Sequence, residues 1–195
     1  MTEIDILVIR HGQSVWNAAG RWQGQADPPL TEIGRRQAEI AAANVVGPFD
    51  VVACSDLKRA HETALIIAAK LEQTQVLTRR DLRERHAGPF EGLTRAQINE
   101  RYPGAIAERE WPDGFEHDDA LIARVCPALS ELARLASARA LVVAHGGVIR
   151  ALDHACGAPS EPIPNLAGRW YHVGSEFRAG ERVEFVPEGV DLGIE

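Results

Sequence analysis

The stretch Ile4-Asp5-Ile6-Leu7-Val8-Ile9-Arg10-His11-Gly12 passes from a short apolar run directly into a cation, an imidazole and a glycine. An apolar run of this length predicts a buried strand over residues 4–9. A second stretch, Ala140-Leu141-Val142-Val143-Ala144, has the same character and leads directly into His145-Gly146-Gly147. Two buried strands that each end in a histidine and a glycine are therefore the basis of the predicted fold.

Working outward from these strands, the chain alternates predicted strands with predicted helices. In chain order we expect a loop over 12–30, a helix from the N-cap Thr31 to about Val46, a strand over 49–53, a helix over 57–71 capped by Ser55-Asp56, a weak strand at Val76-Leu77, broken helix and loop over 88–114, helices over 118–136 and 148–156, and a closing hairpin of 169–173 with 182–186. This alternation predicts an α/β sheet covered by helices on both faces, in one domain spanning residues 1–195.

Composition narrows the class of protein. The 195 residues are 45% apolar and 25% charged, with a net charge of −7, which disfavours nucleic acid as a partner. No apolar run approaches the roughly 18 residues of a membrane span, and the start of the chain lacks the pattern of a secretory signal. The scattered cysteines Cys54, Cys126 and Cys156 suit reduced thiols better than disulfides. We therefore expect a cytoplasmic protein that binds neither membrane nor nucleic acid; a homodimer is left open.

Reactive side chains gather where the predicted strands end. In open α/β sheets, ligands bind beyond the carboxyl ends of the strands. The first strand ends in Arg10 and His11, the second leads to Arg59, and the 140–144 strand ends in His145. If these strands are neighbours, two histidines and two arginines converge on one pocket.

Such a pocket suits phosphoryl transfer. The fixed fork of donors on Arg10 and Arg59 matches phosphate oxygens, and the imidazole of His11 is a competent nucleophile toward phosphorus. A protonated His145 would stabilise charge on the equatorial oxygens, and Gly146 and Gly147 would let backbone N–H groups of the following helix approach the anion. The proton for a departing alkoxide would come from Glu84.

Simpler interpretations of these residues, and other phosphate chemistries, compete with a phosphoryl-transfer pocket. Alone, His11 would more often be structural, Arg59 a solvated helix residue and Glu84 a surface acid. No Gly-x4-Gly-Lys-Ser/Thr loop is present, and four residues separate Cys54 from Arg59 where cysteine phosphatases have five. His61-Glu62-Thr63 does not continue to a second zinc-binding histidine, so we expect no metal.

Several blocks together resemble the histidine phosphatase superfamily, also called phosphoglycerate-mutase-like. They are Leu7 to Ser14 with the Arg-His-Gly signature, Asn17 with Arg21 to Gly24, Asp27 to Gly34, Ser55 to Ala64 with the second arginine, Leu82 to Glu84 with Gly88 and Glu91-Gly92, and Ala144 to Gly147. The resemblance covers most of the chain and preserves the family order of the blocks.

This resemblance implies a three-layer α/β/α sandwich with a mostly parallel central sheet. It also implies that His11 is the phosphorylated nucleophile and that Arg10, Arg59 and His145 bind the phosphoryl group. Glu84 would be the proton donor and then the base. The resemblance implies no cofactor for a phosphatase. The implied substrate-binding positions are Asn17, Gln23, Gly24 and Gly146.

The phosphoryl acceptor is the open question. Residues 94–118 are short and acidic, and a lid with few cations should hold a second phosphate poorly, which favours hydrolysis of a small-molecule phosphate ester. The alternatives are a cofactor-dependent phosphoglycerate mutase and, from a different class, a non-catalytic phosphate-binding or interaction module. Loop aromatics could favour an apolar or sugar-bearing ester, or could equally be packing anchors; they are Trp16, Trp22, Phe90, Trp111 and Phe115.

Overall fold

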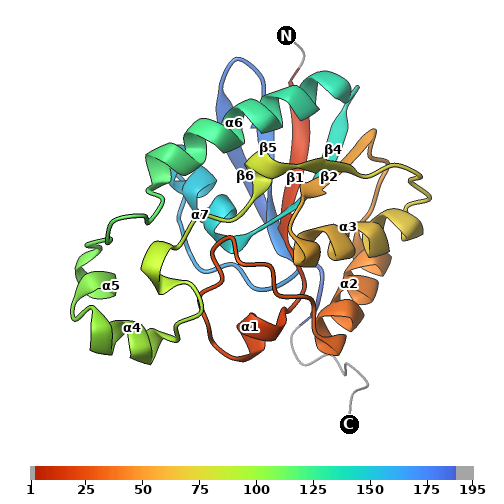
Figure 1. The fold of residues 1–195 in the computed structure, drawn as a ribbon. Coiled ribbons are helices and arrows are strands. Elements are labelled where there is room, and N and C mark those ends of the chain that lie inside the picture. Colours follow the sequence, from red (N-terminus) through yellow and green to blue (C-terminus); the bar gives the residue numbers. More distant parts are fainter. Residues whose placement is uncertain (1–2, 188–195) are drawn as a thin grey trace.

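A computed structural model describes residues 3–187 and contains one six-stranded sheet (Figure 1). The strands are β1 (Ile4–Arg10), β2 (Val51–Ser55), β3 (Leu77–Arg79), β4 (Arg139–Ala144), β5 (Ala167–Val173) and β6 (Phe177–Glu184), in the order β3-β2-β4-β1-β5-β6. The pairs β3-β2, β2-β4 and β4-β1 are parallel, whereas β5 runs antiparallel to both β1 and β6. The predicted mostly parallel sheet is confirmed.

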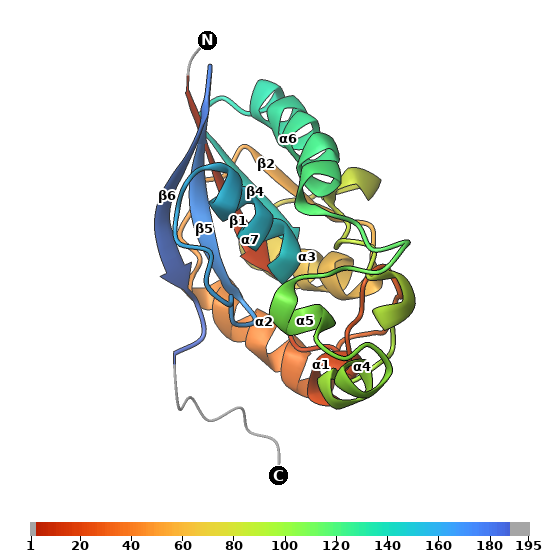
Figure 2. The ribbon, with the colours of Figure 1, turned by 90° about the vertical axis from the view of Figure 1, so that its left-hand side faces the viewer.

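Helices cover both faces of this sheet, as Figures 1 and 2 show. The helices are α1 (Val15–Ala18), α2 (Glu32–Asn44), α3 (Lys58–Lys70), α4 (Arg95–Arg101), α5 (Ala105–Glu108), α6 (Asp118–Leu135) and α7 (Gly146–Ala155), with short 3₁₀ turns at Arg80–Leu82 and Gly88–Phe90. Residues of α6 and α7 share one apolar core with the sheet, and residues of α2 and α3 share the other. The three-layer sandwich is therefore confirmed.

The two strands that lead into His11 and His145, β1 and β4, lie side by side, and each is buried on both faces. In β1, Ile6 and Val8 belong to the core under α6 and α7, whereas Leu7 and Ile9 belong to the core under α2 and α3. This two-sided burial explains why residues 6–9 are all apolar rather than alternately apolar and polar. The parallel register pairs Arg10 with Ala144, so the residues that follow both strands emerge at the same edge.

Several predicted boundaries differ from the structure. The expected loop over 12–30 contains α1, whose first turn is closed by a capping box between Ser14 and Asn17. The predicted cap at Ser55-Asp56 is wrong, because α3 has Leu57 as its N-cap without a side-chain hydrogen bond. The last strand of the hairpin covers Phe177–Glu184 rather than 182–186, since it pairs with β5 along its length.

Other ends shift by only a few residues. The second strand lies at Val51–Ser55 rather than 49–53, and α7 already begins at Gly146, since His145 takes the N-cap position.

Among residues 3–187, no helix is both long and apolar enough to span a membrane.

A small apolar lobe lies beyond the carboxyl edge of the sheet, where α1, α4 and α5 gather in Figure 1. Its buried residues are Ala87, Phe90, Ile98 and Phe115, and partly buried side chains that include Trp22 and Trp111 pack against them. Trp111 stacks on Phe115 with the ring centroids 4.4 Å apart. This lobe gives the loops beside the strand ends a core of their own.

Candidate active site

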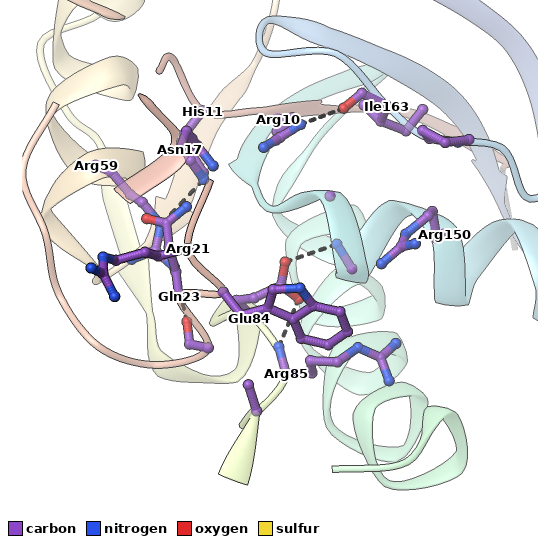
Figure 3. Close-up of a pocket in the computed structure, with 16 residues that line it drawn as sticks. Arg10, His11, Asn17, Arg21, Gln23, Arg59, Glu84, Arg85, Arg150 and Ile163 are labelled. Atoms are coloured by element: carbon purple, nitrogen blue, oxygen red, sulfur yellow. Dashed lines mark hydrogen bonds between the residues drawn. The ribbon is translucent and has the colours of Figure 1, made fainter. Parts of the chain in front are cut away.

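A cavity of about 270 Å³ opens at the carboxyl ends of β1 and β4 (Figure 3). Among the residues that line it are eight positions predicted from the sequence: Arg10, His11, Asn17, Gln23, Gly24, Arg59, Glu84 and Gly146. The ninth, His145, does not line the cavity but lies beside His11, with ring centroids 5.2 Å apart. The tertiary structure therefore brings the predicted residues together.

His11 presents a neutral imidazole with one defined tautomer. Its Nδ1 lies 2.6 Å from the carbonyl oxygen of Gly12. Because a carbonyl only accepts, Nδ1 carries the proton, and the lone pair belongs to Nε2. Burial, followed by the charges of Arg59 and Arg10, holds the pKa of His11 well below 6.5. The ring of His11 therefore keeps an unprotonated Nε2 at neutral pH.

Arg59 is a fully buried cation beside Nε2 of His11. Its Nε donates to His11 Nε2 at 3.2 Å, while Nη1 and Nη2 donate to the carbonyl oxygens of Ala26 at 2.8 Å and Gly24 at 3.0 Å. Burial lowers its pKa to about 10, so the guanidinium stays charged at neutral pH. Such a held guanidinium is poised to meet phosphoryl oxygens.

Arg10 provides the second cation of the cavity. Its Nη1 donates to the Ile163 carbonyl oxygen at 2.6 Å, an interaction visible in Figure 3. Burial lowers the pKa of Arg10, while the nearby charge of Glu84 opposes that shift. Both predicted arginines thus lie where they can neutralise one dianion.

His145 is buried completely, and neither ring nitrogen has a hydrogen-bond partner among residues 3–187. Burial and the charge of Arg59 hold its pKa well below 6.5. We expected a protonated imidazole at this position. The groups of the pocket itself instead keep the ring of His145 neutral. A buried imidazole without a partner costs about 1–3 kcal/mol, and an acceptor oxygen bound beside His11 would remove that cost.

Glu84 lies on the opposite wall, and its carboxylate is held by two backbone amides. Arg85 N donates to Oε1 at 2.8 Å, and Gly147 N donates to Oε2 at 2.8 Å, as the dashed lines in Figure 3 show. The expectation that Gly147 presents its N–H to a substrate anion is therefore wrong. The anion at this helix N-terminus is the protein's own carboxylate, where the helix dipole favours it.

The predicted substrate-binding residues near α1 also have structural contacts. Asn17 Oδ1 accepts from Ser14 N at 3.1 Å, and Gln23 Oε1 accepts from Ser14 Oγ at 2.7 Å. Gly24 has φ +50°, and its carbonyl oxygen holds Arg59. The hydrogen bonds of these two side chains use their carbonyl oxygens. Their amide NH₂ groups can therefore still donate toward the cavity.

Sequence reasoning did not assign a role to Arg150, which lines the same cavity from α7. This residue lies four positions after Gly146, and that helical spacing was the available signal. No ion pair of Arg150 is found among residues 3–187. A partner-free guanidinium at a cavity wall is a candidate ligand for a substrate anion.

A second cavity of about 600 Å³ adjoins the first and shares Trp22, Arg85 and Arg150 with it. Its further lining includes Trp111, Phe115, Arg95, Arg109, Asp118 and Asp119. The lid over 94–118 therefore places two cations at this cavity, more than its acidic composition led us to expect. Of the loop aromatics, Trp22, Trp111 and Phe115 are both lobe core and cavity wall, whereas Phe90 is buried core.

Cys54 lies at the end of β2 as a buried, apolar-like residue, and burial raises the pKa of its thiol to about 12. It therefore provides no thiolate for phosphatase chemistry. Residues 3–187 contain no cluster of three or more His, Cys, Asp or Glu side chains arranged to hold a metal ion.

The model of the histidine phosphatase superfamily (branch 1) matches residues 6–172. The chain belongs to this superfamily, as the sequence motifs predicted.

Among its relatives, the glucosyl-3-phosphoglycerate phosphatase of Mycobacterium tuberculosis is 36% identical over 96% of this chain and 92% of its own length. A metal-independent phosphoserine phosphatase of Arabidopsis thaliana is 40% identical over 76% of this chain and 66% of its own length. A 2,3-bisphosphoglycerate-dependent phosphoglycerate mutase of Gloeobacter violaceus is 36% identical over 76% of this chain and 75% of its own length.

The fold comparison agrees with the sequence comparison. The solved structure of a mycobacterial glucosyl-3-phosphoglycerate phosphatase in complex with VO3 has a TM-score of 0.78 and 32% identity. The match covers 95% of this chain and 99% of that one. The predicted fold is thereby confirmed on a second ground.

Proposed function

We propose that this chain hydrolyses a small-molecule phosphate monoester through a phosphohistidine on His11. The phosphatase relatives already support the enzyme class, a histidine-family phosphatase acting on a phosphate ester. One observation carries the proposed route. The Nε2 atom of His11 is unprotonated and accepts a hydrogen bond from Arg59, and the cavity that His11 lines is also lined by Arg10. A neutral nucleophile next to two cations is what attack on a phosphate dianion requires.

In the first step, His11 Nε2 forms a bond to phosphorus while the bond from phosphorus to the ester oxygen breaks. Glu84, protonated for this step, gives its proton to the departing oxygen, so an alcohol leaves rather than an alkoxide. Arg10 and Arg59 donate to the phosphoryl oxygens, and His145 donates from its neutral ring. The Gly12 carbonyl stabilises the positive charge that develops on His11 by accepting from Nδ1.

In the second step, water attacks the phosphohistidine. The Glu84 carboxylate takes a proton from this water as its oxygen bonds to phosphorus, and the bond between nitrogen and phosphorus breaks. His11 returns to its neutral form, Glu84 is protonated again, and inorganic phosphate leaves.

The same proposal extends to the alcohol part of the ester. The second cavity adjoins the first at Arg150, and one partner-free guanidinium matches one carboxylate. A second phosphate dianion would meet the carboxylates of Asp118 and Asp119 in this cavity. Phosphoserine and glucosyl-3-phosphoglycerate, named for two relatives, each carry a carboxylate beside the phosphate ester. We therefore favour a phosphate ester whose alcohol part bears a carboxylate.

The nucleophile is tested with His11→Ala. Hydrolysis of para-nitrophenyl phosphate should fall below about one thousandth of the wild-type rate, because the proposed route begins with a bond from His11 Nε2 to phosphorus. Denaturing quench of the wild type should trap acid-labile phosphate on the chain, which the variant should lack. His61→Ala, a histidine outside both cavities, is the control and should keep its activity. Near wild-type hydrolysis by His11→Ala would contradict the route.

The substrate class is tested with Arg150→Ala. The KM for phosphoserine or 3-phosphoglycerate should rise about tenfold or more, because a charge-assisted hydrogen bond is lost. The kcat/KM for para-nitrophenyl phosphate, which has no carboxylate, should change little. Equal effects on both kinds of substrate would count against a carboxylate at Arg150.

A phosphoglycerate mutase is the second candidate, because one relative is so named and Arg95 and Arg109 line the second cavity. Conversion of 3- to 2-phosphoglycerate with a bisphosphate primer, faster than phosphate release, would favour it. Binding of phosphate esters without any turnover would instead favour the non-catalytic module.

A further inference from the structure

Arg124, on α6, lies outside both cavities, yet every N–H group of its guanidinium has an acceptor. Nε and Nη2 donate to the two carboxylate oxygens of Glu116, both at 2.8 Å. Nη1 donates to the carbonyl oxygens of Asp81 at 2.7 Å and Arg83 at 2.8 Å, and Nη2 also donates to that of Glu84 at 3.0 Å. A guanidinium has five donors, and all five are used here.

Three of these acceptors belong to the segment that carries the proposed proton donor. Residues 84–86 are neither helix nor strand, so their backbone groups receive no partners from a regular ladder. Arg124 supplies donors to the carbonyls at 81, 83 and 84, and Glu116 Oε2 accepts from His86 N at 2.9 Å. This ion pair, together with the backbone hydrogen bond that Glu116 N donates to the His86 carbonyl oxygen at 2.9 Å, therefore holds the chain on both sides of Glu84.

A second contact fixes the other end of Glu84. Its backbone carbonyl is held by Arg124 from α6, while its carboxylate is held by Gly147 N at the start of α7. The helices α6 and α7 pack against each other on the same face of the sheet. Glu84 is thus held by contacts from two helices, one to its backbone carbonyl and one to its carboxylate.

The ion pair itself is largely withdrawn from water, with Arg124 and Glu116 side chains 19% and 15% exposed. Arg85 reinforces the same segment, donating to the Glu116 carbonyl at 3.0 Å and to Asp118 Oδ1 at 2.6 Å. A pair that is both bidentate and shielded holds its geometry more firmly than a surface pair would.

We propose that Arg124, clamped by Glu116, is a positioning residue that holds Glu84 at the place where it can protonate the leaving group. This inference rests on the proposed role of Glu84 as the proton donor. Arg124 itself touches neither cavity. Through Glu84 it acts on the step in which a proton must reach the departing oxygen, and on the later step in which Glu84 takes a proton from water.

The test measures how strongly the rate depends on the leaving group. Ring-substituted phenyl phosphates, from para-nitrophenyl phosphate to phenyl phosphate, differ in leaving-group basicity but little in size. Their kcat/KM reports the steps up to departure of the phenol, before water attacks. With a working acid this dependence is shallow, and without one it becomes steep.

The variants are Arg124→Lys and Arg124→Met, with Glu84→Gln as the reference for a missing acid. Arg134→Met, an exposed arginine on the same helix, is the matched control. In both Arg124 variants, kcat/KM for phenyl phosphate should fall about 10- to 100-fold more than that for para-nitrophenyl phosphate, because a displaced acid fails where it is needed most. Arg134→Met should keep the wild-type dependence. Since both substrates are assayed on one preparation, this ratio does not depend on the fraction of folded protein.

Two outcomes would overturn the inference, and they are distinguishable. If Glu84→Gln steepens the dependence and both Arg124 variants leave it shallow, Arg124 does not position the acid. If Glu84→Gln also leaves the dependence shallow, Glu84 is not the proton donor, and the inference fails together with that part of the proposed function.

Discussion

At the scale of single residues, the site depends on which atoms are already engaged within the protein. His11 keeps its lone pair on Nε2 because Gly12 occupies Nδ1, and Glu84 keeps its place because Gly147 offers an N–H at 2.8 Å. Gly147 also leaves room for that carboxylate. A Cβ atom there would lie 2.0 Å from Glu84 Oε1, whereas at Gly146 it would meet Arg10 Cδ at an ordinary 3.5 Å.

These two adjacent glycines make a matched pair for mutation. Gly147→Ala should lower kcat about 100-fold, because the new methyl group must push the Glu84 carboxylate aside. Gly146→Ala should cause a much smaller loss, and both variants should fold, since alanine suits the first turn of a helix. Steady-state kinetics with phenyl phosphate and circular dichroism provide the measurements. Similar kcat values for the two variants would argue that the Gly147 contact is unimportant.

At the scale of elements, the backbone of Gly12 and Gln13, which follows His11, packs directly on the first turn of α2. A Cβ atom on Gly12 would lie 2.4 Å from the Gly34 carbonyl oxygen, and one on Gly34 would lie 2.0 Å from the Gln13 carbonyl oxygen. Both obstacles are backbone atoms, which cannot rotate away as a side chain can. The position of the Gly12 carbonyl, and hence the tautomer of His11, therefore depends on this helix.

Replacing Gly34 tests that dependence. Gly34→Ala should lower the free energy of unfolding by about 1–3 kcal/mol, the usual cost of overpacking, and should lower kcat as the loop moves. Arg36→Ala, which removes an exposed pair with Glu39 on the same helix, should cost no more than about 0.5 kcal/mol. Urea unfolding of both variants checks the difference. An unchanged midpoint for Gly34→Ala would mean that the loop and helix can separate without cost.

At the scale of the whole molecule, burying two neutral histidines makes stability depend on pH. The pKa values of His11 and His145 lie well below 6.5 in the folded protein, chiefly because of burial. Below about pH 6.5 the unfolded chain therefore binds protons that the folded protein does not, so stability falls as the pH falls.

The expected slope approaches about 1.4 kcal/mol per pH unit for each histidine, between the unfolded and folded pKa values. His145→Gln should reduce the slope between pH 6.5 and 5 while leaving its sign unchanged, because His11 still contributes. Urea unfolding at several pH values provides the test. An identical slope in the variant would show that His145 gains no proton on unfolding in this range.

Carboxylates add a second loss at lower pH. Burial is the largest influence on Glu116 and opposes its ionisation, but the hydrogen bonds from Arg124 and His86 N, together with the charges of Arg124 and Arg85, outweigh it and lower the pKa. The pKa of Asp50 is also lowered, first by the backbone amide of Arg139. Carboxyl groups with lowered pKa values stabilise the folded state above their unfolded pKa, and this contribution disappears as the pH falls through the folded pKa.

Much of the fold was predictable because local and tertiary preferences agree. The apolar runs at residues 4–9, broken only by Asp5, and at residues 140–144 predicted central strands, and Thr31 indeed accepts a hydrogen bond from Gly34 N as the cap of α2. Prediction failed where a tertiary contact takes a side chain away from its local role. Asp56 pairs with Arg83 through two 2.7 Å hydrogen bonds and so does not cap α3.

The sequence by itself determined the reactive set of this protein, because strands that end in Arg10-His11-Gly12 and His145-Gly146-Gly147 must place those residues at one edge once they pair in parallel. Only the tertiary structure decided how the set is charged and held. Burial makes both imidazoles neutral. The N–H of Gly147 donates to the Glu84 carboxylate rather than to a substrate anion, and Arg124, on α6, donates to the Glu84 backbone carbonyl. These properties depend on desolvation and on contacts between residues far apart in the chain, and spacing along a sequence encodes neither.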